Sequence, residues 1–83
     1  MSDLHDAGNR DRWEAWVREA CAALGVESSL VDIDAIHALT KEVAHRFERP
    51  LAPVSSFILG LAIAGGGDPD ALRSRLEATL PPA

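Results

Sequence analysis

The longest uncharged stretch of the chain, residues 50–67, predicts a short helix that is apolar on every side. Between Val54 and Ala64 the only polar residues are Ser55 and Ser56. A helix that is hydrophobic all round is typically surrounded by other elements and does not lie on a surface. We therefore expect this helix, over residues 54–64, to be the buried centre of the fold, with the neighbouring segments forming its walls.

Apolar residues recur at helical spacing ahead of Gly25, and they predict an amphipathic helix over residues 11–24. Asp11 resembles an N-cap, and Glu14 completes the spacing of a capping box. Gly25 suits the left-handed position that ends a helix. Aromatic residues at this spacing are typical of a core, so we expect both tryptophans and the single thiol to be buried. The apolar face consists of Trp13, Trp16, Val17, Ala20, Cys21 and Leu24.

Asp32 resembles the N-cap of a second amphipathic helix, predicted over residues 33–48. Asp34 places another negative charge in the first turn, where it favours the helix dipole. At 100° per residue the apolar side chains fall within an arc of about 140°, which we expect to face the core. That arc consists of Ile33, Ile36, Leu39, Thr40, Val43, Ala44 and Phe47.

The opposite side of this second helix carries Lys41, His45 and Arg49, at positions i, i+4 and i+8. Residues four apart are neighbours on a helix surface, so the three predict a short basic ridge. One interpretation is a solvated face, with Arg49 near the negative end of the helix dipole. The other is a binding site for a phosphate or an acidic partner surface, because Lys and Arg donors suit both. The sequence leaves these two interpretations open.

Proline and glycine mark the boundaries of the last two predicted helices. Pro50 and Pro53 end the second helix and open the apolar one. After Gly65–Gly67, Asp68 resembles an N-cap with proline behind it, which predicts a fourth helix over residues 69–80. Its packing residues are Leu72, Leu76 and Leu80.

Gly60 stands in the middle of the apolar helix, where glycine costs about 1 kcal/mol relative to alanine. With Ala64 one turn later it forms a ridge of small residues that allows another helix to approach closely. We expect that helix to belong to the same chain in preference to a second copy.

These elements predict an all-α protein: a compact four-helix bundle with the third helix buried at its centre. The expected organisation is a disordered leader over residues 1–10, a single helical domain over 11–80 and a tail over 81–83.

The composition limits the classes of partner that the protein is expected to bind. The chain has 8 Lys and Arg against 13 Asp and Glu, a net charge of −5, and it lacks the basic stripe that nucleic-acid binding requires. The helical part of the apolar stretch is about 16 Å long, against about 30 Å for the hydrocarbon core of a bilayer. A single cysteine, with no secretory signal pattern at the start, favours a reducing compartment. We expect a cytoplasmic protein that binds neither nucleic acid nor membrane.

The search for chemistry finds no catalytic motif. His37 and His45 are eight residues apart, about 12 Å along a helix, so one metal ion cannot take both. The glycines before Asp68 fit neither phosphate-binding pattern, and Asp68 puts a carboxylate where an anion would sit. We expect no metal, no cofactor and no catalytic residue.

The run from Ala44 to Gly65 is similar to that of a known family. It reads A-H-x-x-x-R-P-x-A-P and then F-x-x-G-x-A-x-x-G. These residues resemble a small, uncharacterised helical domain of actinobacteria, and weaker similarity extends over residues 11–80. In that family the domain occurs alone or fused to a molybdenum-cofactor guanylyltransferase. Stand-alone members are commonly labelled as molybdopterin-guanine dinucleotide biosynthesis proteins. The residues carrying the motif are His45, Arg49, Pro50, Pro53, Phe57 and Gly60.

The resemblance implies a pathway and not an activity. Nucleotidyl transfer requires a glycine-rich phosphate cradle, a basic residue on the phosphates and a carboxylate-bound magnesium ion, and this sequence has no motif for them. We therefore expect a non-enzymatic accessory or interaction domain that assists the guanylyltransferase in trans. Two alternatives stay open: a domain that binds a small anionic ligand at the basic ridge, and a purely structural dimerisation module. The expected oligomeric state is a monomer or a weak homodimer.

Overall fold

The computed structural model describes residues 7–82 of the chain, and the regular elements among these residues are all helices, with no strand. The predicted all-α class is confirmed. The chain divides into two compact units, Met1–Val31 and Asp32–Ala83. Residues 1–6 of the predicted leader and Ala83 of the predicted tail lie outside the described residues. The α-helices are α1 (Ala7–Leu24), α2 (Ile33–Arg46), α3 (Ala52–Ala64) and α4 (Pro69–Glu77), with 3₁₀ turns η1 (Ser28–Leu30) and η2 (Arg49–Leu51).

The first unit consists of α1 and η1. α1 begins at Ala7, so the predicted cap at Asp11 is wrong and residues 7–10 belong to the helix. The extra turn lets Arg10 reach Glu14 at 3.7 Å, an i,i+4 pair that requires helix through residue 10. The predicted ending at Gly25 is confirmed. Gly25 has φ +69°, and the amide of Val26 donates to the Cys21 carbonyl at 2.9 Å, which is the Schellman arrangement.

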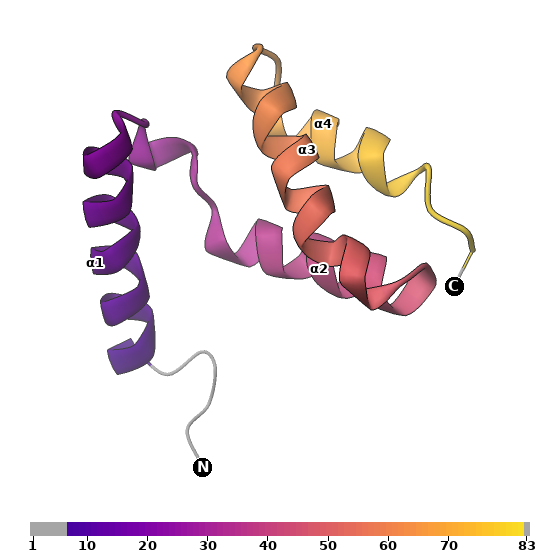
Figure 1. Ribbon diagram of the computed structural model, residues 1–83, viewed down its shortest axis with the longest axis horizontal. Coiled ribbons are helices and arrows are strands. Elements are labelled where there is room, and N and C mark those ends of the chain that lie inside the picture. Colours follow the sequence, from indigo (N-terminus) through magenta and orange to yellow (C-terminus); the bar gives the residue numbers. More distant parts are fainter. Residues whose placement is uncertain (1–6, 83) are drawn as a thin grey trace. The chain divides into compact units, whose positions relative to one another are not determined.

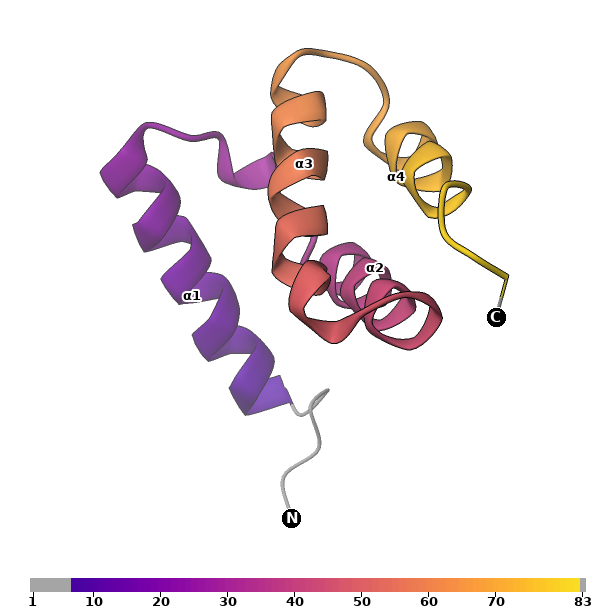
Figure 2. The ribbon, with the colours of Figure 1, turned by 45° about the vertical axis from the view of Figure 1, so that its right-hand side comes forward.

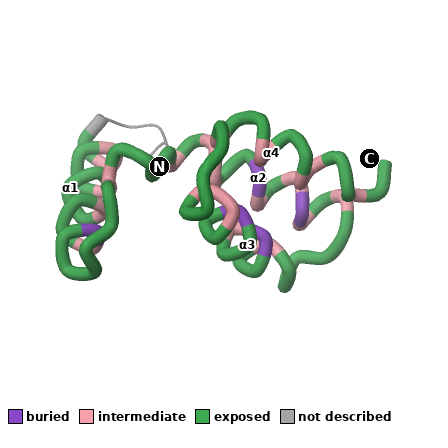
Figure 3. Tube along the Cα trace, turned by 90° about the horizontal axis from the view of Figure 1, so that it is seen from above, coloured by how far each residue is buried: buried purple, intermediate pink, exposed green. Residues whose placement is uncertain are grey.

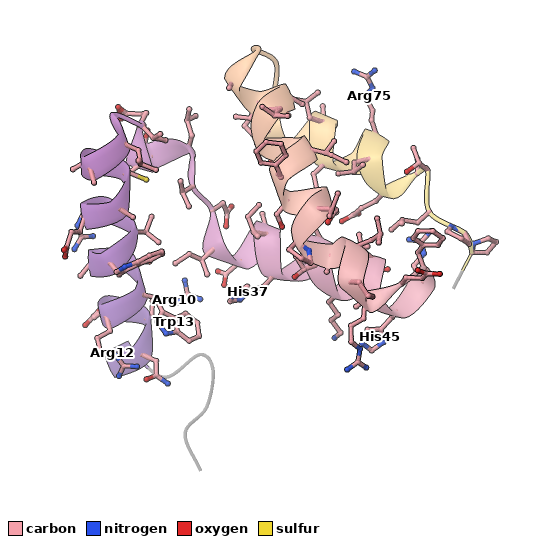
Figure 4. The ribbon with its side chains drawn as sticks, in the orientation of Figure 1. Arg10, Arg12, Trp13, His37, His45 and Arg75 are labelled. Carbon is pink, nitrogen blue, oxygen red and sulfur yellow. The ribbon has the colours of Figure 1, made fainter. Side chains whose placement is uncertain are left out.

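Burial along α1 differs from the prediction. Cys21 is buried at 8% exposure, as expected, but Trp16 is 68% exposed and Leu24 79%. Trp13, labelled on α1 in Figure 4, is half-buried. A single helix followed by one 3₁₀ turn offers too little surface to cover a stripe of six apolar side chains, and two of the six, Trp16 and Leu24, are exposed.

The second unit packs α2, α3 and α4 against one another (Figures 1 and 2). Both predicted N-caps are confirmed: Asp32 accepts from the amide of Ala35 at 3.0 Å, and Asp68 accepts from that of Ala71 at 2.9 Å. The core is the cluster of Leu39, Val43 and Leu59, and the buried positions of this unit in Figure 3 lie on α2 and α3. Partly buried residues around that cluster are Ile36, Ala52, Ile63, Leu72, Leu76 and Leu80.

Two helices in this unit end earlier than predicted. α2 stops at Arg46, and Phe47 is 55% exposed with φ −136° and ψ −102°, so its predicted place in the core is wrong. Glu48 is extended, with φ −138° and ψ 136°, and η2 begins at the next residue. α4 stops at Glu77, and the Thr79 hydroxyl donates to a carbonyl of the last turn at 2.6 Å.

α3 contacts both α2 and α4, which gives it the central place that the sequence predicts. Its burial within the second unit is one-sided, however. Ser55 and Leu59 are buried, whereas Phe57 and Leu61 are exposed. Two neighbouring helices cover only part of the circumference of a third. This unit therefore buries less of α3 than the sequence predicts. None of the described helices is both long enough and apolar enough to span a membrane.

Candidate functional site

The uncovered side of α3 is the candidate site, and we call it the α3 face. At 100° per residue its members occupy an arc of about 160° along the helix. Phe57 is 68% exposed and Leu61 60%, the largest values on this helix among large apolar residues. Every member is apolar and exposed. They are Pro53, Val54, Phe57, Ile58, Gly60, Leu61 and Ala64.

The polar groups of α3 lie away from this face. Ser55 is buried and its hydroxyl donates to the Ala52 carbonyl at 2.6 Å, and the Ser56 hydroxyl donates to the same carbonyl at 3.4 Å. Both hydroxyls thus donate to a carbonyl of the first turn. The α3 face therefore presents hydrocarbon alone.

Gly60 lies at one edge of the α3 face. A Cβ placed on it would meet nothing within 4 Å. The predicted close approach of a helix from the same chain is therefore not met by α2 or α4. The position still costs about 1 kcal/mol relative to alanine, because glycine loses more backbone freedom on forming a helix. Packing in the second unit does not account for that cost.

The predicted basic ridge is divided in the structure. Lys41 and His45 are exposed on α2, and His45 projects outward from that helix (Figure 4). Arg49 lies on η2, since α2 has already ended, and the i, i+8 relation does not hold. Within the described part of the chain none of the three side chains forms a hydrogen bond or an ion pair. Lys41 and His45 of α2 can both donate hydrogen bonds to an anion, but from one side only.

Arg46 is a residue whose role the sequence did not reveal. Its Nε donates to the Pro81 carbonyl at 2.9 Å, its Nη2 to the Leu80 carbonyl at 3.4 Å, and its Nη1 lies 3.4 Å from Glu42. The i,i+4 spacing to Glu42 was visible in the sequence. The two carbonyls lie 34 and 35 residues away, and no local pattern indicates them. Arg46 therefore holds the segment that follows α4 against α2.

Charge is placed only beyond the two ends of α3. From Pro50 to Gly67 no residue is charged. Arg49, exposed, precedes this segment with Glu48 beside it, and two exposed acids, Asp68 and Asp70, follow it. The α3 face thus has an end with an unpaired cation and an end with only acids.

Residues 8–81 match the model of a family described as a domain of unknown function, DUF6457. The chain belongs to this family. The match begins in α1 and ends at residue 81, after α4. Both units are therefore part of the DUF6457 domain. No curated protein and no solved structure matches the chain.

In this DUF6457 domain, the six residues that carry the motif described above share one property: all are exposed. Pro53, Phe57 and Gly60 belong to the α3 face, and the other three lie at the end of α2 and on η2. They are His45, Arg49, Pro50, Pro53, Phe57 and Gly60. The alanines of the same run, Ala44, Ala52 and Ala62, are half-buried, so the run contributes to packing as well as to the exposed surface.

Metal ligation is not built into the described residues. No group of three or more His, Cys, Asp or Glu side chains among them is placed to hold an ion. Asp34 and His37 supply two potential ligands, one fewer than a catalytic zinc site takes from a protein.

Proposed function

We propose that this DUF6457 protein is a non-enzymatic interaction domain that binds a molybdenum-cofactor guanylyltransferase through the α3 face. The observation that supports the proposal is the exposed, wholly apolar surface formed by Val54, Phe57, Ile58 and Leu61. At their exposed fractions these four side chains present roughly 400–500 Å² of hydrocarbon, the size of the largest apolar patch on a typical monomeric protein, which is often functional.

The chemistry of the face fits binding better than catalysis. Hydrocarbon side chains cannot transfer a proton, attack a phosphorus atom or hold magnesium. They gain free energy when a partner removes them from water, at about 25 cal/mol per Å². The α3 face is suited to holding a protein, and any reaction belongs to that partner.

The identity of the partner comes from the family resemblance. In a fused arrangement the tether supplies an effective concentration in the millimolar range, so even a weak contact is occupied. A stand-alone chain has no tether and must supply affinity from its own surface. An exposed aromatic at the centre of an apolar patch, here Phe57, is the kind of residue that carries such affinity. The lone Cys21 favours a reducing compartment, and the proposal places the complex in the cytoplasm.

The test is a binding titration of the full chain against its cognate guanylyltransferase, followed by calorimetry or fluorescence anisotropy. We expect association at micromolar concentrations and at least a tenfold loss of affinity in Phe57→Ala, the usual effect of truncating an interface aromatic. Phe47→Ala is the matched control, since Phe47 is also an exposed phenylalanine, at 55%, but lies outside α3. The affinity of this variant should lie within about twofold of the parent's affinity.

Absence of binding at tens of micromolar, with a catalytically active transferase, would overturn the proposal. Equal losses in Phe57→Ala and Phe47→Ala would overturn the assignment of the α3 face.

A further inference from the structure

We infer that the α3 face also binds the α3 face of a second copy of this chain, with the two helices antiparallel about a two-fold axis. This inference goes beyond the guanylyltransferase proposal and does not depend on it. It is carried by the charges at the two ends of α3 and by the order of large and small residues between them.

The charges favour an antiparallel arrangement. Arg49 stands at the start of the uncharged segment, and Asp68 and Asp70 stand at its end, all exposed. An antiparallel pair places the start of one α3 beside the end of the other, so that each Arg49 meets the acids of the second copy. A parallel pair would instead place Arg49 against Arg49 and acid against acid, which is repulsive. The opposed helix dipoles favour the same arrangement.

Neighbouring groups refine this contact. Asp68 uses one carboxylate oxygen to cap the amide of Ala71 at 2.9 Å, so Asp70 and the second oxygen of Asp68 remain for Arg49. Glu48 is the exposed acid at the Arg49 end. Because Arg49 is one residue nearer to α3 and has the longer side chain, the arginine reaches the second copy first.

The order of residues along the face is complementary to itself. A two-fold axis between Gly60 and Leu61 sets each Leu61 opposite a Gly60 and each Phe57 opposite an Ala64. Large side chains then lie over small ones on both sides, which lets the two helices approach to about 8 Å. This arrangement gives Gly60 a purpose that packing within the second unit does not, since a Cβ there would meet nothing within 4 Å.

The size of the face predicts a weak dimer. Two faces of roughly 400–500 Å² bury about 1,000 Å² together, against about 1,600 Å² for a stable complex of standard size. We therefore expect dissociation in the range of tens to hundreds of micromolar. A dimer this weak can be exchanged for another partner on the same face, so self-association and guanylyltransferase binding should compete.

Sedimentation equilibrium of the full chain, from about 10 μM to 1 mM at low salt, tests the inference. The weight-average mass should rise from that of one chain, 8.9 kDa, toward that of two. Arg49→Glu should raise the dissociation constant about tenfold, and Arg49→Glu combined with Asp70→Arg should restore it. Arg75→Glu is the matched control, because Arg75 is an exposed arginine of α4, projecting away from α3 in Figure 4. It should leave the constant unchanged.

Gly60→Ala supplies an independent measurement, because the two effects expected of it have opposite signs. The added methyl group meets no atom in the single chain, so the melting temperature of dilute protein should rise. The same methyl group should weaken self-association severalfold.

A single-chain mass at 1 mM would show that the face is not shared between copies and would overturn the inference. Failure of the double variant to recover affinity would overturn the antiparallel pairing of charges. A result against guanylyltransferase binding would leave the sedimentation data standing, so the two proposals fail separately.

Discussion

Leu59 and Leu61 lie two residues apart on α3 and differ mainly in burial. Leu59 is 3% exposed and belongs to the core with Leu39 and Val43, whereas Leu61 is 60% exposed on the α3 face. Changing either leucine to alanine removes the same three carbons from the same helix. Comparing Leu59→Ala with Leu61→Ala therefore isolates the effect of burial on stability.

The expected losses in the free energy of unfolding differ severalfold between the two variants. Truncating a fully buried leucine costs about 2–5 kcal/mol, since the transfer energy is lost and a cavity remains. At Leu61 only about two-fifths of that hydrocarbon is covered, and alanine is the slightly better helix former, so the net loss is about 0.5 kcal/mol. A domain of this length has a free energy of unfolding of about 4–12 kcal/mol. Leu59→Ala therefore removes a large share of it.

Urea unfolding followed by far-UV circular dichroism measures both losses. The protein is kept at a few micromolar, where the weak dimer inferred above is dissociated. We expect a large fall in the urea midpoint for Leu59→Ala, a small one for Leu61→Ala and an unchanged slope for both. Similar losses in the two variants would show that Leu61 is as well covered as Leu59, and would refute one-sided burial of α3.

Three further predictions concern the ends of the helices. Asp32→Ala removes the side chain that caps α2 and should cost about 0.5–2 kcal/mol in urea unfolding, whereas Asp32→Asn should recover most of the loss. Gly25→Ala puts a side chain at φ +69° and should cost about 1 kcal/mol; a gain in stability would contradict the left-handed ending of α1. Arg46→Met removes the donors to Leu80 and Pro81 and should speed hydrogen exchange of the Leu80 amide about tenfold at unchanged helix content. Unchanged exchange would show that Arg46 does not hold the chain end.

The features that sequence reasoning predicted correctly are local. Asp32 and Asp68 each cap an amide three residues on, and Gly25 ends α1 through bonds that span a few residues. Such contacts depend on residue types at fixed short spacing, which the sequence displays directly. The core residues Leu39 and Val43 follow from the same logic, because α2 has a polar side that orients it.

The features that sequence reasoning missed depend on what lies across from each element. Phe47 continues the periodic pattern of α2, but the helix ends at Arg46 and the pattern no longer applies. Trp16 lies on an apolar stripe that is only partly covered, and it is 68% exposed. The divided basic ridge has the same cause as Phe47: Arg49 falls beyond the helix on which its spacing was counted.

The uniform apolarity of α3 explains both the prediction and its shortfall. A helix with hydrocarbon on every side has no polar face, so periodicity carries no information about which side meets the core. Its apolar composition does indicate that much of its surface needs to be covered by neighbouring residues. α2 and α4 supply that cover for Ser55 and Leu59 and leave an arc of about 160° without it. Leaving roughly 400–500 Å² of hydrocarbon in water forgoes about 10 kcal/mol of burial energy, which a partner gains in part when it binds. The residues that predict a buried centre are therefore the same ones through which we propose that the outer side of α3 binds a partner.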